Sequence, residues 1–290
     1  MPINSKAVKR RIKSVGNTKK ITKALELVSA SKMRRAVDAT LRTRTYARMA
    51  RQVLDLLRQV DTTQFPLLTV RPVEKILLIL ISSNRGLCGS YNANIFKKTR
   101  ILLRDALAEI AKHPVVMNNE EKETVVIGTP EVHVVGVGKK SAEFAKRQGY
   151  HLAAVFDELG ERPTFEDILP ISRMLLEAYE AGAYQKILIS YTSYKSSLTQ
   201  EAKMIQLLPI YASEIEELIN RTAAPNTSPP VEKKSNLDEY IFEPSLEDIL
   251  TSILPRLVEI QLYQTILESA ASEHSSRMMA MRNASDAAAE

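Results

Sequence analysis

The chain has 290 residues, of which 44% are hydrophobic and 26% charged, a composition typical of a globular protein with a substantial core. Its charge is uneven, because residues 1–51 hold 15 Lys or Arg against two acids, Glu26 and Asp38, while the remainder is mildly acidic. The single cysteine, Cys88, excludes an intramolecular disulfide and a cysteine-based zinc cluster. The longest strongly apolar run, 76–81, is too short to span a bilayer, and the first residues lack the apolar segment of a signal peptide. We therefore expect an intracellular protein, which could still dock on a membrane complex.

The first predicted element is a long helix over residues 1–60. After Pro2 it contains no further proline and only one glycine, Gly16, which favours an uninterrupted helix. Apolar residues recur at spacings of three and four, as in a helix that packs against another helix. They are Val8, Ile12, Val15, Leu25, Val28, Met33, Ala36, Val53, Leu54 and Leu57, and the stripe weakens in its middle, around Thr22 and Ser29. A helix of this length extends roughly 80 Å and must project from a globular domain.

Residues 73–212 are predicted to form a central α/β domain. Strands are expected at 75–82, 131–137, 151–156 and 185–192, with an edge strand at 202–210, and helices at 93–111, 140–147 and 165–181. This alternation indicates a mainly parallel sheet in a three-layer domain. The range 113–130 is interpreted as an insertion, and the proline-rich range 221–236 as a linker.

The last predicted element is a helix over residues 245–290. Apolar or small residues recur at every seventh position in two companion rows, which begin at Leu246 and Leu250, and this is typical of a coiled-coil seam. Pro255 predicts a kink or a restart of the helix, and His274 is interpreted as a polar residue that sets the register. The fold class is therefore α/β plus coiled coil, in which the two terminal helices wind around each other and the central domain is inserted between them.

The sequence offers little catalytic chemistry. Residues 136–141 resemble a phosphate loop but lack its upstream glycine and its adjacent Lys-Ser pair, so an ordinary strand-to-helix turn is predicted. Cys88 has no histidine near it in sequence, and the four histidines lack metal-ligand spacing. We expect no catalytic, cofactor or metal site.

The basic N-terminal helix has three interpretations. It could be a solvated helix face, a surface for nucleic acid, or a surface for an acidic protein collar. Aromatic residues, which would stack on bases, are almost absent from it, since Tyr46 is the only one in residues 1–51. A basic coiled-coil module that binds nucleic acid remains the alternative function from composition alone.

Three segments carry recognisable motifs. Residues 12–35 begin Ile-Lys-Ser-Val-Gly-Asn-Thr and end Ser-Lys-Met-Arg-Arg, residues 82–92 read Ser-Ser-Asn-Arg-Gly-Leu-Cys-Gly-Ser-Tyr-Asn, and residues 262–286 end Met-Arg-Asn-Ala-Ser-Asp. In this order they resemble the N-terminal helix, the Ser-x-x-Arg-Gly-Leu-Cys-Gly loop and the C-terminal signature of the gamma subunit of F-type ATP synthases, bacterial type. The resemblance covers both terminal helices and the central domain.

The resemblance implies a non-catalytic central-stalk rotor that couples transmembrane ion flow to ATP synthesis or hydrolysis. One copy would turn inside the hexamer of alpha and beta subunits and would contact the epsilon subunit and the c-subunit ring, with no nucleic-acid partner and no cofactor. The complex would lie at the cytoplasmic face of the plasma membrane, and an acidic helix-turn-helix of the beta subunits would face the basic helix. The candidate contacts carried over by motif are Leu25, Lys32, Arg34, Arg35, Arg85, Glu273 and Arg277. Glu273 and Arg277 are four residues apart and can pair on one helix face.

Two departures from the family pattern are visible. Family members continue beyond the Asn-Ala-Ser-Asp motif, so we expect the sequence that stops at Glu290 to be incomplete. The insertion 113–130 contains no cysteine pair, so the thiol switch of the chloroplast relatives cannot operate within it.

Overall fold

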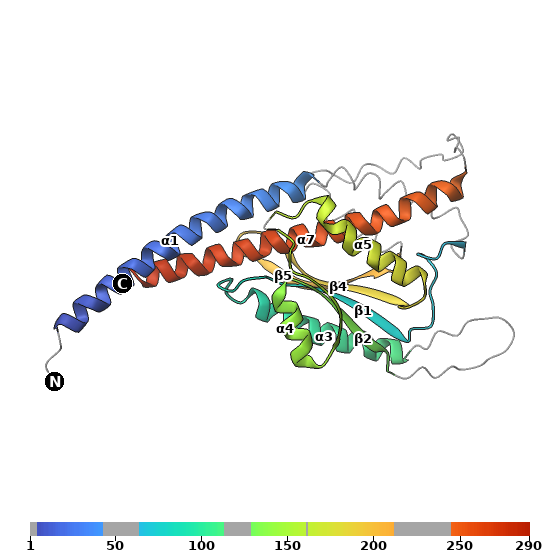
Figure 1. Cartoon of the computed structure of the whole chain (residues 1–290), viewed down its shortest axis with the longest axis horizontal. Coiled ribbons are helices and arrows are strands. Elements are labelled where there is room, and N and C mark those ends of the chain that lie inside the picture. The colour runs from blue at the N-terminus through green and yellow to red at the C-terminus, as the bar shows by residue number, and fades with distance from the viewer. Residues whose placement is uncertain (1–4, 43–63, 113–128, 161, 212–244) are drawn as a thin grey trace.

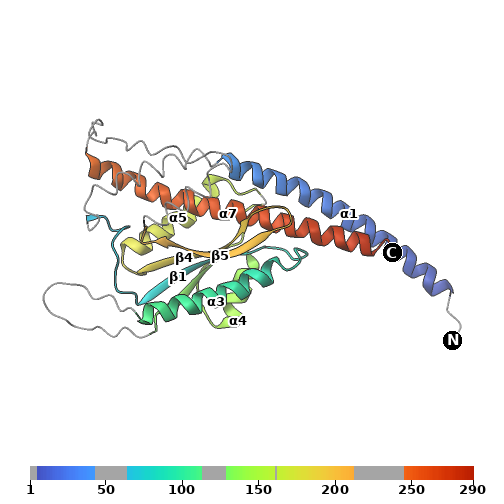
Figure 2. The same cartoon turned by 180° about the vertical axis from the view of Figure 1, so that it is seen from behind.

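A computed structural model describes residues 5–42, 64–112, 129–160, 162–211 and 245–290. Helix α1 (Ser5–Arg42) runs antiparallel to helix α7 (Leu246–Ala287), and the two lie side by side in both views (Figures 1 and 2). This confirms the predicted pairing of the terminal helices. The predicted linker, most of the predicted insertion and residues 43–60 of the first helix lie outside the described residues.

The central domain contains one sheet of five strands in the order β3-β2-β1-β4-β5. The strands are β1 (Lys75–Ile81), β2 (Glu131–Val137), β3 (His151–Phe156), β4 (Lys186–Tyr194) and β5 (Gln200–Leu208). The first four are parallel to their neighbours, and β5 pairs antiparallel with β4 at the edge. The mainly parallel sheet and its edge strand are therefore confirmed, with bounds that differ by a few residues.

Helices cover both faces of the sheet. On one face lie α3 (Tyr91–Lys112) and α4 (Lys139–Gln148), and on the other lie α5 (Phe165–Glu180) and α7 (Figure 1). Strand β1 supplies both faces, since Leu77 and Ile79 join the core under α5 and α7 while Ile76 and Leu78 join the core under α3 and α4. A strand buried on both sides explains why 75–82 reads as a continuous apolar run.

Helix α7 belongs to two parts of the molecule. Its first half packs on the sheet through buried side chains such as Leu254, Leu257 and Leu262, and its second half lies along α1. The C-terminal helix is thus one layer of the α/β domain as well as half of the helix pair. A heptad pattern cannot reveal this, because it records which side is apolar and not what covers it.

Helix α7 continues through Pro255 without interruption, so of the two predicted outcomes, a kink or a restart, the restart is wrong. The helix is well initiated ten residues earlier, where the Ser245 hydroxyl accepts a hydrogen bond of 3.1 Å from the Asp248 amide. Glu247 and Asp248 in the first turn also favour the positive end of the helix dipole. Proline removes one backbone hydrogen bond, but the apolar side chains that pack on the sheet beyond it hold the helix together.

The contact between α1 and α7 is made by small residues. The buried residues of α1 are Thr22, Ser29 and Ala36, which repeat every seven positions and continue the row of Val8 and Val15. The apparent weakening of the apolar stripe is therefore the seam itself, where small side chains let the two helices approach closely. Within the described residues, no helix is long and apolar enough to cross a membrane.

Candidate functional site

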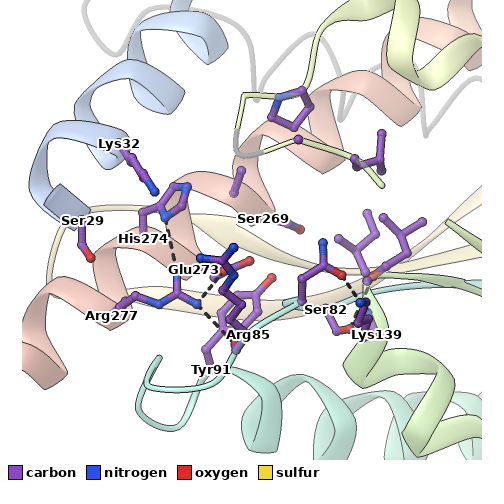
Figure 3. A pocket seen from close by; sticks show the side chains of 18 of the residues that line it. Ser29, Lys32, Ser82, Arg85, Tyr91, Lys139, Ser269, Glu273, His274 and Arg277 are labelled. Carbon is purple, nitrogen blue, oxygen red and sulfur yellow. Dashed lines mark hydrogen bonds and ion pairs between the residues drawn. The ribbon is translucent and has the colours of Figure 1, made fainter. Parts of the chain in front are cut away.

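A cavity of about 630 Å³ lies where β1, β2 and β3 end, and we call it the strand-end cavity. The segments that follow these three strands form part of its wall, and α1 and α7 form the rest (Figure 3). Five of the seven residues carried over by motif line it: Leu25, Lys32, Arg85, Glu273 and Arg277. Side chains from α1, from the loop after β1 and from α7 thus meet at one site.

The segment between β1 and α3 is held rigidly beside this cavity. The Ser83 amide donates to the Asn92 side-chain oxygen at 3.2 Å, and the Asn92 amide group donates back to the Ser83 hydroxyl at 2.7 Å. The same amide group approaches the buried Cys88 sulfur at 3.3 Å. Cys88 is thus enclosed by its own loop.

Backbone geometry favours glycine at two positions near the cavity, Gly89 and Gly138. Gly89 has a φ of +56°, and a Cβ there would contact the Ala280 side chain of α7 at 3.6 Å. Gly138, at the start of α4, has a φ of +94°, and a Cβ there would lie only 2.3 Å from the Ser82 carbonyl oxygen. At Gly138 the turn lies closer to the end of β1 than any side chain allows, whereas at Gly89 the positive φ alone favours glycine, because a Cβ there would make an ordinary contact.

Arg277 ties helix α7 to the loop after β1. Its guanidinium pairs with the Glu273 carboxylate at 2.7 Å, and it also donates to the backbone carbonyls of Arg85 and Gly86 at 3.3 Å (Figure 3). Both side chains of the ion pair are largely buried. The predicted i,i+4 pairing is confirmed, and the two carbonyl contacts extend it into a link between the helix pair and the sheet.

Arg34 and Arg35 do not join this cluster. Both are exposed on α1, and Arg35 donates to the Ser31 hydroxyl at 2.9 Å on the same helix. Leu25 and Lys32, by contrast, line the cavity from one side of α1. The charged residues of the first motif thus point in at least two directions.

The turn at 136–141 has no vacant phosphate cradle. The Gly138 amide donates to the Phe156 carbonyl, the Lys139 amide to the Asn84 side chain, and the Lys140 amide to the Ser83 carbonyl. The amides that would bind a phosphate at this helix start are therefore already engaged. The prediction of an ordinary strand-to-helix turn holds.

Tyr91 is a buried residue of the site that sequence reasoning missed. Burial raises the pKa of its hydroxyl well above the usual value, and the nearby Glu273 carboxylate raises it further. Tyr91 lies two residues after Gly89 within the second motif, so its position was a usable signal. Among the described residues, no group of three His, Cys, Asp or Glu is arranged to hold a metal ion.

Comparison with known proteins gives a consistent match. The family model described as ATP synthase matches residues 4–290. A protein named ATP synthase gamma chain from Roseiflexus sp. (strain RS-1) is 37% identical over 290 residues, which cover 99% of this chain and 88% of the relative. The protein of the same name from Heliobacterium modesticaldum is 37% identical over 284 residues, 98% of this chain and 87% of the relative.

Solved structures share the fold. A chain of the Tetrahymena thermophila mitochondrial ATP synthase central stalk and c-ring superposes with a TM-score of 0.60 at 21% identity, covering 91% of this chain and 99% of that one. A chain of the Euglena gracilis mitochondrial ATP synthase rotor gives a TM-score of 0.54 at 18% identity, with coverage of 97% and 90%.

Proposed function

The chain belongs to the ATP synthase gamma-chain family, and on this premise we propose that α1 and α7 form a shaft that turns inside the hexamer of alpha and beta subunits. A gamma chain is the non-catalytic central-stalk rotor of an F-type complex. Ion flow turns the c-subunit ring and the shaft with it. The asymmetric surface of the shaft then favours a different state in each beta subunit in turn, so that rotation shifts their populations.

The distribution of charge on α1 carries this proposal. Residues 5–42 hold twelve Lys or Arg against Glu26 and Asp38, and every one of the twelve except Lys32 is exposed. The face against α7 uses small residues instead. The helix therefore binds its partner on one side and presents a dense positive surface on the other, which suits an acidic collar that surrounds it.

The remaining partners follow from this arrangement. The α/β domain lies at one end of the helix pair, and we assign to it the contacts with the epsilon subunit and the c-subunit ring. One copy serves each complex, because one shaft fills one hexamer. The complex is placed at the cytoplasmic face of the plasma membrane.

Co-purification tests this function directly. Co-expressed with its alpha and beta subunits, the chain is expected to purify with them in a fixed ratio and to support persistent ATP hydrolysis. Binding to duplex DNA with a steep salt dependence, without hexamer assembly, would instead support the nucleic-acid alternative.

Charge reversal tests the proposed surface. The triple variant Lys32→Glu, Arg34→Glu, Arg35→Glu is expected to pump fewer ions per ATP hydrolysed in membrane vesicles, because repulsion replaces attraction to the acidic collar. A matched control, Lys32→Arg, Arg34→Lys, Arg35→Lys, keeps all three positive charges and should keep the wild-type ratio. Equal ratios in both variants would refute the role of this surface.

A further inference from the structure

We propose that the strand-end cavity binds a small amphipathic anion, a molecule with a carboxylate, sulfonate or phosphate head and an apolar body. This goes beyond the rotor function, since a shaft needs no internal ligand. The proposal rests on three properties of the cavity: its place in the sheet, its charge and its apolar wall.

The cavity lies where α/β sheets usually bind ligands. The chain runs from β1 to β2 and β3 on one side of the sheet, and then returns to β4 on the other side of β1. The strand order therefore reverses between β1 and β4. The cavity lies beside that point, outside the carboxyl ends of β1, β2 and β3, and the carboxyl ends of the strands are the side on which sheets of this architecture commonly bind ligands. Ile81 and Ser82, at the end of β1, line the cavity. Its volume of about 630 Å³ is ample for a small molecule.

The described lining is net positive. Four cationic side chains line the cavity, Lys32, Arg85, Lys139 and Arg277, and they come from four different segments. Among the described lining residues there are two carboxylates, and both have a cation beside them: Glu273 is 2.7 Å from Arg277, and Asp157 is 3.7 Å from Lys139. An anionic head group would therefore be attracted to the site, and low-dielectric walls would strengthen that attraction.

The rest of the wall is apolar. Leu25 and Val28 approach from α1, Leu159 and Pro163 from the segment between β3 and α5, and Ile266 from α7. Val28 remains 48% exposed in spite of its place at the cavity. A hydrophobic body that covered these side chains would remove apolar surface from water, so the cavity favours an anion with an apolar part over a bare inorganic anion.

A set of three probes separates the two halves of the proposed ligand. Fluorescence titration of the full chain uses 8-anilinonaphthalene-1-sulfonate, the neutral N-phenyl-1-naphthylamine and inorganic sulfate. The sulfonate dye is expected to bind at one saturable site and to raise the unfolding temperature. The neutral dye should bind about tenfold more weakly, because it lacks the charge. Equal affinity for both dyes would contradict the anion preference.

Variants locate the binding site. Lys32→Glu should weaken dye binding about tenfold, whereas the matched reversal Lys98→Glu, on the exposed side of α3, should leave it unchanged. Ala270→Phe, which fills the cavity without changing its charge, should abolish binding, with circular dichroism as the test of folding. Because Lys32→Glu alters only a partly exposed side chain, it keeps the test decisive if Ala270→Phe does not fold.

One control addresses the exposed apolar face of α1. Ile12→Ser removes a side chain that is 66% exposed and distant in sequence from the cavity lining. Dye binding that falls in Ile12→Ser but persists in Lys32→Glu would place the dye on the helix face and overturn the proposal. Co-purification with alpha and beta subunits is scored separately, so failure of the cavity proposal leaves the rotor function standing.

Discussion

Helices α1 and α7 lie side by side, yet they are buried to very different degrees. Among its described residues α1 buries only Thr22, Ser29 and Ala36, and it leaves large apolar side chains such as Ile12 and Leu27 more than 60% exposed. Helix α7 buries a long row of leucines and isoleucines between the sheet and α1. Helix α7 is therefore anchored in the α/β domain, whereas α1 is held mainly through its contact with α7.

The largest expected effect contrasts one side chain from each helix. Leu262→Ala on α7 should lower the free energy of unfolding by about 2–5 kcal/mol, because Leu262 is fully buried in the main core. Ile12→Ala on α1 should change it by less than about 0.5 kcal/mol. Urea unfolding followed by circular dichroism measures both, and similar losses in the two variants would show that α1 is anchored as firmly as α7.

The next effect concerns the seam between the helices. Ser29→Leu places a large side chain where only a small one fits and should cost about 1–3 kcal/mol. Hydrogen exchange should accelerate in α1 and remain slow in α7 and the sheet, because α7 keeps its other contacts. Lys20→Leu, at an exposed position of α1, is the control and should exchange like the wild type.

A smaller effect is expected at the link between α7 and the loop after β1. Arg277→Gln removes the ion pair with Glu273 and weakens the contacts with two loop carbonyls, at a cost of about 1–2 kcal/mol. Amide exchange in residues 83–90 should accelerate. Arg277→Lys keeps the charge but not the planar fork, so it should recover only part of the protection. If the exposed Arg282→Gln has the same effect, the link is not specific.

The last effect is a loss of stability in alkali. Burial raises the pKa of Tyr179 on α5 to about 12, although Arg71 opposes this shift. An unfolded tyrosine releases its proton near pH 10. The folded state is therefore favoured below pH 10, and this contribution is lost as pH rises from about 10 to 12. Tyr179→Phe should therefore lose less stability than the wild type between pH 10 and pH 12. Midpoints of urea unfolding measured from pH 9 to 12 test this. The same dependence of the midpoint on pH in both proteins would show that Tyr179 plays no part.

Much of the architecture could be predicted from the sequence. Strand β1 was identifiable because a strand buried on both faces is apolar at every position, and the helix pair because its heptad rows are long. The row through Thr22 and Ser29 was harder to interpret, since close helix packing uses small residues that resemble a break in an apolar stripe. Pro255 predicted a restart that packing on the sheet prevents.

The site was predictable only in part. The motifs identified five candidate residues that all line the strand-end cavity in the structure: Leu25, Lys32, Arg85, Glu273 and Arg277. The contact of Arg277 with the Gly86 carbonyl joins residues 191 positions apart, and no local pattern encodes such a distance. Asp157 was missed, and Lys139 was considered only within the phosphate-loop-like segment 136–141, because both line the cavity only once three strand ends are aligned.

The continuity of α7 has a mechanical consequence. Helix α7 passes from the layer on the sheet into the helix pair as one continuous helix, with no loop between the two parts. When the α/β domain turns while the other end of the helix pair is held, there is no hinge at which the two ends can rotate relative to each other. The angular difference between them is then stored as elastic twist along helix α7. Helix α1, whose main described contact is with α7, is twisted together with it.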